Sequence, residues 1–273
     1  MSASFYRIFI CSKYAKSRFV RGLSTVISTV ILTFTLLIIV LSTSAFVTEV
    51  FSFQQENAEF KQAKYVMLTL ASSINDVAYT PYSSNYVKTG FKSAMPQLVD
   101  TGGTIQILVN DNSIATIPIR KIVIQGGRRV DASEENLVGV DDLLVADIST
   151  PLSRVYVNRN DRAEVVLDYS RVRCVYLGTL TFYDSNQTYN IVEIVAVNLS
   201  FGTIRAYKEA VFSVQNTGIT VSQIQASGNF TIHVVSPNRE EEVSLTGLGG
   251  NATYPTLVNL QLINIQVSLL GGG

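Results

Sequence analysis

The amino-acid sequence predicts an α+β fold, in which one long N-terminal helix, hydrophobic and then amphipathic, precedes a mainly antiparallel β-sandwich. Residues 23–47 form an uncharged hydrophobic run, and no glycine or proline follows it before Pro81. Helix-forming residues fill the stretch between them, so a single helix is expected over residues 23–80. From about Thr104 the pattern changes to short runs of Val, Ile, Thr and Tyr bounded by Gly, Asn, Asp and Ser, which is typical of a sandwich of many strands.

The charge distribution argues against nucleic-acid binding. The chain has 21 basic and 21 acidic residues, but residues 1–22 contain five basic residues and no acid. Removing those five leaves 16 basic against 21 acidic residues. The rest of the chain therefore lacks the excess of positive charge that binding to a phosphate backbone requires. The two cysteines, Cys11 and Cys174, lie on opposite sides of the hydrophobic run, and we expect both thiols to be unpaired.

The hydrophobic run is long enough to cross a membrane. At about 1.5 Å per helical residue, residues 23–47 exceed the roughly 30 Å of a bilayer's hydrocarbon core. The basic residues precede the run and the first acid, Glu49, follows it. The positive-inside rule therefore places the N-terminus in the cytoplasm and residues 81–273 outside the cell. The alternative is a buried helix in a soluble core, which such a long uncharged run with a basic flank disfavours.

The second half of the predicted helix carries an apolar stripe with the spacing of an a/d seam. Glu56 interrupts the stripe close to the hydrophobic run, and the helix should end at Tyr79 and Thr80 because the residue before Pro81 is pushed out of the α region. We expect the stripe to pack under the chain's own β-domain rather than to serve only as a subunit contact. Its members are Phe53, Phe60, Ala63, Met67, Leu70, Ile74 and Val77.

The junction between the basic tail and the hydrophobic run reads Arg21-Gly22-Leu23-Ser24. A basic residue and a glycine before a cut, with a small polar residue soon after it, resemble the class III signal of archaeal type IV pilins and archaellins. In that family a prepilin peptidase cuts on the cytoplasmic side, here between Gly22 and Leu23, and the mature protein keeps its membrane helix. Two other interpretations of the segment are an uncleaved anchor and a secretory signal cut after Ala45.

The resemblance implies a basic signal over residues 1–22, a long helix over residues 23–80 and an extracytoplasmic β-domain over residues 81–273. It also implies that helices of this chain or of other pilins pack into a filament core. The expected partners are thus other pilin subunits, a prepilin peptidase and, before assembly, the membrane. Bacterial pilins have a glutamate at the fifth mature position, where this chain has Ile27, which suits the archaeal branch. The residues expected to pack in the core are Ile27, Ile31, Phe34, Leu36 and Val40.

The segment from Val211 to Val221 looks like the Ig-like hairpins of archaellins, with its turn at Asn216 to Gly218. The expected domain is therefore an Ig-like sandwich. Its predicted strands are Thr104–Val109, Ile114–Ile124, Arg154–Val157, Ala163–Tyr169, Val172–Tyr183, Tyr189–Asn198, Ile204–Gln215, Ile219–Gln225, Asn229–Val235 and Pro255–Leu269.

Four Asn-X-Ser/Thr sequons lie on the side of the membrane expected to be outside. Glycans need surface turns, and Asn186 and Asn251 have the most loop-like neighbours. We expect some of the four to be glycosylated in the native host. They are Asn186, Asn198, Asn229 and Asn251.

No pattern of catalytic or metal-binding residues stands out. His233, the one histidine, has strand-like neighbours, and Cys174 has no histidine near it in sequence. Asp141-Asp142 lacks the alternating oxygen ligands of a calcium loop, and residues 126–129, Gly-Gly-Arg-Arg, lack the lysine and serine of a phosphate-binding loop. We therefore expect no enzyme, metal or cofactor. The two aspartates should form a solvated turn, residues 126–129 an exposed cationic hairpin tip, and Cys174 a buried inert thiol.

These observations favour a pilin-like structural subunit of an archaeal surface filament, whether major, minor or adhesive, that acts by helix assembly and surface contact. Such a subunit is a cell-surface glycoprotein that crosses the membrane once before assembly. The alternative is a membrane-anchored extracytoplasmic β-sandwich binding module that does not polymerise. An enzyme has the least support, because the sequence offers no catalytic constellation.

Overall fold

A single helix and thirteen strands make up the part of the chain that the computed structural model describes, residues 5–184, 186–205, 209–227 and 230–271. The chain divides into two compact units, Met1–Gln54 and Gln55–Gly273. The first unit is entirely helical where it is described, and the second contains the end of the helix and every strand. The α+β prediction is therefore confirmed.

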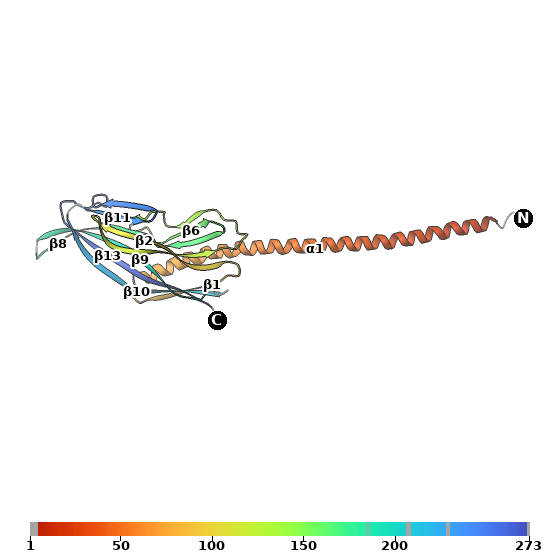
Figure 1. Cartoon of the computed structure of the whole chain (residues 1–273), viewed down its shortest axis with the longest axis horizontal. Coiled ribbons are helices and arrows are strands. Elements are labelled where there is room, and N and C mark those ends of the chain that lie inside the picture. The colour runs from red at the N-terminus through yellow and green to blue at the C-terminus, as the bar shows by residue number, and fades with distance from the viewer. Residues whose placement is uncertain (1–4, 185, 206–208, 228–229, 272–273) are drawn as a thin grey trace. The chain divides into compact units, whose positions relative to one another are not determined.

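Helix α1 runs from Phe5 to Ala78 without a break (Figure 1). The expected helix over residues 23–80 is confirmed, and the helix ends two residues before the predicted boundary. It begins earlier than expected: the basic segment is also helical, from Phe5 onward. Threonine hydroxyls inside the hydrophobic run donate to carbonyls one turn earlier: Thr33 Oγ1 lies 2.7 Å from the oxygen of Thr29. Such bonds satisfy polar groups within the helix itself, as an apolar environment requires.

The apolar stripe of α1 is buried where the helix belongs to the second unit. Met67, Leu70 and Ile74 are fully buried, and the remaining stripe members from Phe60 to Val77 are at most 4% exposed. They belong to one core cluster that also includes side chains from strands of both sheets. The prediction that the stripe packs under the chain's own β-domain is thus confirmed for residues 60–77 but is wrong for Phe53, which is 44% exposed and belongs to the first unit.

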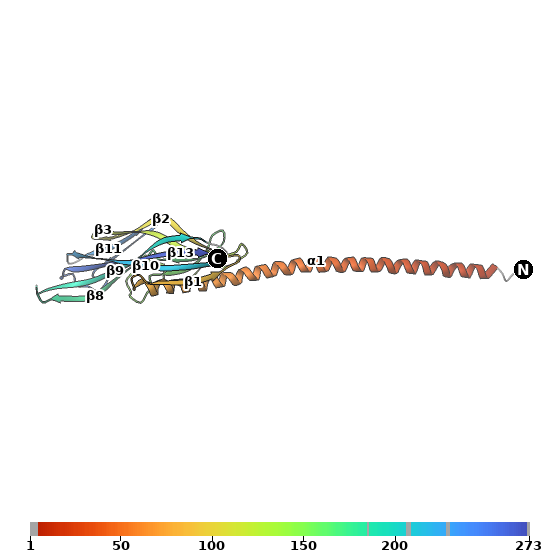
Figure 2. The same cartoon turned by 90° about the horizontal axis from the view of Figure 1, so that it is seen from below.

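Two sheets form the β-domain. One has six strands in the order β1-β10-β13-β9-β8-β5, and the other has seven in the order β12-β11-β2-β3-β7-β6-β4. Figures 1 and 2 show them as two layers, with β2, β3 and β11 in one and β9, β10 and β13 in the other. The strands are β1 Ser84–Gly90, β2 Met95–Val109, β3 Asn112–Gln125, β4 Glu135–Val138, β5 Leu144–Val145, β6 Arg154–Arg159, β7 Ala163–Asp168, β8 Val172–Phe182, β9 Gln187–Ile204, β10 Glu209–Ala226, β11 Thr231–Ser236, β12 Arg239–Ser244 and β13 Thr256–Gly271.

The sheets share a core, but only one of them is antiparallel throughout. Ile107 of the seven-stranded sheet lies in the same buried cluster as Ile194 and Val258 of the six-stranded sheet. Every pairing in the seven-stranded sheet is antiparallel. In the six-stranded sheet, β13 pairs with β9 and β5 with β8 in parallel. The six-stranded sheet is therefore mixed, while β1, β10 and β13 and the β8–β9 pair remain antiparallel, so the described pairings are mainly antiparallel, as expected.

The expected hairpin from Val211 to Val221 is wrong, because these residues belong to the single strand β10. The strand pairs with β13 along its whole length, with a bulge between Asn216 and Gly218. Asn216 is fully buried, and its Nδ2 donates to the carbonyls of Val77 at 2.9 Å and Ala78 at 2.8 Å. These carbonyls lie at the C-terminal end of α1, where they lack partners within the helix. The Asn-Thr-Gly sequence therefore does not form a hairpin turn. Asn216 stays within strand β10 and caps the C-terminal end of α1.

Two carboxylates of α1 bind loops of the β-domain. Glu59 Oε2 accepts hydrogen bonds from the backbone N–H of Lys92 at 3.1 Å and of Ser93 at 2.7 Å, and from the Ser93 hydroxyl at 2.6 Å. Glu56 Oε2 accepts from the backbone N–H of Arg129 at 2.9 Å. Burial alone would raise the pKa of Glu59, but hydrogen bonds from Ser93, Gln55 and Lys92 outweigh it and lower the pKa to about 2.

The Gly-Gly-Arg-Arg segment is not the exposed tip that its sequence predicts. Gly126 and Gly127 are buried against α1, and a Cβ on Gly127 would lie 2.4 Å from the carboxylate oxygen Oε2 of Glu56. A side chain at this position would force the Glu56 carboxylate to move away from residues 127–129. Only the two arginines that follow are exposed.

Candidate functional site

The five residues expected in a filament core lie in the first unit, on the part of α1 that is exposed throughout residues 25–51. Each of them is more than half exposed. The helix is long and apolar enough to cross a membrane once, with a mean hydropathy of 2.5 in its most apolar window. Such a surface must be covered by lipid or by another apolar surface. The residues are Ile27, Ile31, Phe34, Leu36 and Val40.

The expected processing junction lies within the same helix. The helical backbone continues through Arg21, Gly22, Leu23 and Ser24. A cut after Gly22 would remove the basic segment and leave a helix from Leu23 to Ala78.

The four sequons have different surroundings. Asn186 and Asn251 are exposed and lie next to turns, and the backbone of Asn186 has a φ of 52°. Asn198 is half-buried in β9, between β13 and β8, and its Nδ2 donates to Oδ1 of Asn264 at 2.9 Å. A sugar attaches to that nitrogen, so the geometry favours Asn186 and Asn251 and disfavours Asn198 as acceptors. Asn229 lies outside the described residues.

A polar pocket of about 400 Å³ lies against the seven-stranded sheet. Its wall comes from four segments that are far apart in sequence: the β2–β3 region, the loop between β4 and β5, the β6–β8 region and the turn between β11 and β12. Its charged lining residues are Lys121, Arg154, Arg171, Arg239, Asp141, Asp142 and Asp168. We call these seven residues and the space that they surround the ionic pocket.

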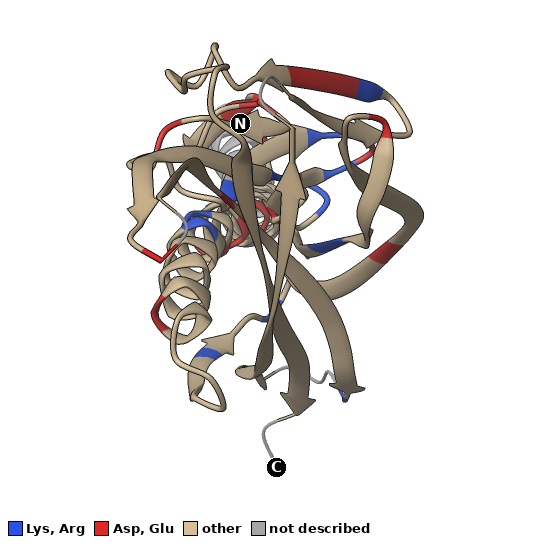
Figure 3. Ribbon diagram, turned by 90° about the vertical axis from the view of Figure 1, so that its left-hand side faces the viewer, with Lys and Arg blue, Asp and Glu red and all other residues tan. Residues whose placement is uncertain are grey.

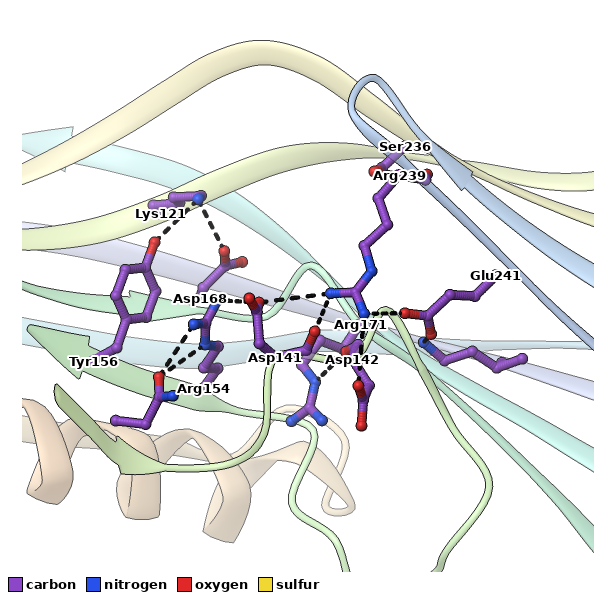
Figure 4. Close-up of polar contacts among 12 residues, drawn as sticks. Lys121, Asp141, Asp142, Arg154, Tyr156, Asp168, Arg171, Ser236, Arg239 and Glu241 are labelled. Atoms are coloured by element: carbon purple, nitrogen blue, oxygen red, sulfur yellow. Dashed lines mark hydrogen bonds and ion pairs between the residues drawn. The ribbon is translucent and has the colours of Figure 1, made fainter. Parts of the chain in front are cut away.

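Cross-strand pairing places three of these charges side by side. Asp168 of β7 lies opposite Lys121 of β3 on one side and Arg154 of β6 on the other. Lys121 Nζ lies 3.0 Å from a carboxylate oxygen of Asp168 and 3.3 Å from the hydroxyl of Tyr156 (Figure 4). Burial alone would lower the pKa of Lys121, but Asp168 and Tyr156 raise it overall, so the ammonium stays charged at neutral pH. The Arg154 guanidinium lies 4.2 Å from the ring centroid of Tyr156.

Arginines connect the aspartate loop to the sheets. The Asp141 carboxylate forms ion pairs with Arg154 and Arg239, and Arg239 also pairs with Glu241 at 2.5 Å (Figure 4). The side chains of Asp141 and Asp142 are 67% and 55% exposed, so the ionic pocket is accessible from solvent. The expectation of a solvated turn at these aspartates is thus right about exposure, but both of them belong to an ion-pair network.

Arg171 is the most buried of the pocket's basic residues, at 4% exposure. Its Nε donates to the carbonyl of Asp142 and its Nη1 to that of Pro151, both at 2.8 Å. Among the described residues, no carboxylate forms an ion pair with it within 4 Å, and its buried Nη2 has no hydrogen-bond partner. Burial lowers the pKa of this guanidinium, although Asp142 opposes that effect.

The residues of the ionic pocket gave no recognisable signal in the sequence. They are spread from Lys121 to Arg239 without a motif, and Figure 3 shows basic and acidic residues on many segments of the chain. The pairing of β3, β7 and β6 brings Lys121, Asp168 and Arg154 together, and the other four residues come from other segments. The other polar candidates lie elsewhere. His233 lies in β11, as expected, with its ring nitrogens 3.5 Å from Glu240 and Glu242. Cys174 is buried as a free thiol, also as expected.

Comparison with known proteins finds no match to a protein family, to a curated protein or to a solved structure. The fold by itself defines an α+β protein with one apolar N-terminal helix that is able to cross a membrane and a two-sheet β-domain.

Proposed function

We propose that this protein is a pilin-like structural subunit of an archaeal surface filament, with an Ig-like β-domain. The observation that carries the proposal is the contrast along α1. Its first part exposes large apolar side chains over residues 26–41, whereas its last part is buried in the β-domain. The buried part of the helix belongs to the folded β-domain, and the exposed part is available to pack against lipid or other helices.

The free energy of burial decides what the exposed part can do. At about 25 cal/mol per Å² of apolar surface, covering so many Val, Ile, Leu and Phe side chains amounts to tens of kcal/mol. Lipid covers this surface before assembly, and the helices of neighbouring copies replace the lipid in a filament. Ser and Thr residues near the helix start are small enough to let helix backbones approach closely. The hydroxyl of Thr29 already bonds within its own helix, 2.8 Å from the carbonyl of Val26, so it needs no partner across an interface.

The junction at Arg21 to Ser24 supports the same proposal through its resemblance to the class III signal. Cleavage there by a prepilin peptidase removes the basic residues that hold the N-terminus in the cytoplasm. The remaining helix begins with uncharged residues and is free to leave the bilayer. In this proposal the β-domain lies outside the cell, and glycans on Asn186 and Asn251 add a polar coat to it.

The second candidate is a membrane-anchored extracytoplasmic binding module that does not polymerise. The ionic pocket favours it, since convergent polar groups in a solvent-accessible pocket can fix the orientation of a bound ligand. The two candidates differ in what covers the exposed part of α1. In the second candidate lipid covers it permanently, and the chain stays in the membrane as a monomer.

The deciding experiment compares material sheared from the cell surface with membranes from the native host. Electron microscopy and N-terminal sequencing of the sheared fraction should find filaments whose subunit begins at Leu23. The variant Ile31→Asp should reach the membrane but be absent from filaments, because a charge in the helix core has no partner there. Gln62→Asp is the matched control: it adds the same charge at an exposed position of α1 beyond the apolar segment, and should assemble like the wild type. Wild-type protein found only in membranes, as a monomer in mild detergent, would refute the filament and favour the anchored module.

A further inference from the structure

The ionic pocket has a composition that the filament proposal does not use. Four of its lining residues are basic and three are acidic, and Glu241 beside the pocket pairs with Arg239, so every basic lining residue except Arg171 has a close carboxylate partner. We propose that the ionic pocket binds an acidic saccharide, a sugar ring that bears a carboxylate. This inference is independent of whether the chain polymerises.

One basic residue of the pocket lacks an ion-pair partner. Lys121 pairs with Asp168, Arg154 with Asp141, and Arg239 with Glu241. That leaves Arg171, whose contacts are two neutral carbonyls and whose burial is nearly complete. The buried Nη2 of Arg171 has no hydrogen-bond partner. A buried cation without an ion-pair partner is costly, and a bound anion lowers that cost. A carboxylate in the pocket therefore gains from the field of Arg171 and from the nearby ammonium of Lys121.

The rest of the lining suits a hydroxylated ring. Asp141 and Asp142 present exposed carboxylate oxygens that accept hydrogen bonds from hydroxyl groups, while Thr101, Ser236 and Asn238 can both donate and accept. Ile119, Leu143 and Pro237 supply apolar surface for the carbon face of the ring. The volume of about 400 Å³ lies within the range of small-molecule sites. A simple carboxylate would interact only with the basic residues of the pocket. A neutral sugar would form only hydrogen bonds and apolar contacts with the lining.

The test measures binding of D-glucuronate, D-glucose and acetate to the detergent-solubilised full chain by saturation-transfer NMR and titration calorimetry. We expect glucuronate to bind with a Kd of about 1 mM or better, and both other probes to bind at least tenfold more weakly. A tenfold change corresponds to about 1.4 kcal/mol. Added NaCl should weaken glucuronate binding, because salt screens the charge interaction.

Two variants assign the binding to the pocket. Arg171→Gln and Lys121→Gln should each weaken glucuronate binding at least tenfold. Lys121→Gln keeps a hydrogen-bond donor for Asp168, so it decides the matter if Arg171→Gln fails to fold. Lys88→Gln removes the same charge from an exposed position of β1 in the other sheet, and should leave the affinity unchanged.

Three results would overturn the proposal. The first is that no binding is detected at a glucuronate concentration about tenfold above the expected Kd. The second is equal affinity for glucose, which would remove the role of the charge, or for acetate, which would remove the role of the ring. The third is a loss of affinity in Lys88→Gln as large as in Lys121→Gln, which would place the binding outside the ionic pocket.

Discussion

Glu59 joins helix α1 to the loop between β1 and β2, and replacing it with glutamine tests this connection. Its Oε2 accepts from three backbone N–H groups and one hydroxyl, and its Oε1 accepts from Gln55 Nε2 at 2.9 Å. Glutamine keeps the shape but removes the negative charge. Its Nε2 also offers hydrogen atoms where the carboxylate oxygens accept. We expect Glu59→Gln to fold with a lower free energy of unfolding.

The size of the effect follows from the pKa of Glu59. The pKa falls from 4.5 to about 2 on folding, and each pKa unit corresponds to about 1.4 kcal/mol. Allowing for screening by solvent, we expect a loss of about 2 kcal/mol at pH 7. Because the folded-state pKa is the lower one, the stabilisation is present above pH 4.5 and is lost as the pH falls towards 2. The difference between wild type and Glu59→Gln should therefore nearly disappear at the acidic end of this window.

Urea unfolding of the detergent-solubilised full chain, followed by tyrosine fluorescence at pH 7 and at pH 2.5, measures both parts of this prediction. The matched control is Glu56→Gln, one turn earlier on the same helix, where the carboxylate accepts from the backbone N–H of Arg129. That variant should lose about 1 kcal/mol at pH 7, the usual value for one hydrogen bond. Equal unfolding free energies of wild type and Glu59→Gln at pH 7 would refute the reasoning. So would a 2 kcal/mol difference that persists unchanged at pH 2.5.

Three further predictions follow from the described contacts. Asn216→Ala removes the donor of the Ala78 carbonyl, one of three donors to the Val77 carbonyl, and the acceptor of the Gly218 N–H. It should lower the free energy of unfolding by about 2–4 kcal/mol in the same urea assay, and a change below about 0.5 kcal/mol, the usual size of a surface effect, would contradict the cap. Glycopeptide mass spectrometry of native protein should find glycans on Asn186 and none on Asn198, and the reverse pattern would contradict the geometry. Burial raises the pKa of the Cys174 thiol to about 12, so iodoacetamide should modify it in urea but not in the folded protein at pH 8.

The helix and most strands were predictable because their signals are local. The stripe from Phe60 to Val77 depends only on spacing along one helix, and its burial followed as expected. The predicted strand Pro255–Leu269 corresponds to β13, whose composition is typical of a strand. Strands with weak or polar patterns were not, and β1, β4, β5 and β12 were all missed. Whether such short segments form strands depends on packing against residues far away in the chain, so their own sequences carry little strand signal.

The error at Asn216 has a specific physical cause. Asn-Thr-Gly is a strong turn signal, because asparagine and glycine tolerate a positive φ. The structure uses the same tolerance for a bulge, in which Gly218 has a φ of 144° and its N–H donates to Oδ1 of Asn216. The strand continues because β13 pairs with both halves of β10. Only that long-range pairing distinguishes a bulge from a hairpin.

The sequence by itself determined the membrane-length helix, the point near Pro81 where it stops and the change to β-structure, because composition and spacing along the chain are sufficient for each. Tertiary structure decided that the last strand, β13, lies between β9 and β10 and runs parallel to β9. It also decided that Lys121, Asp168 and Arg154 stand side by side. Strand partners and their register depend on contacts between residues far apart in the chain. No local pattern specifies them, and the ionic pocket exists only after those contacts have formed.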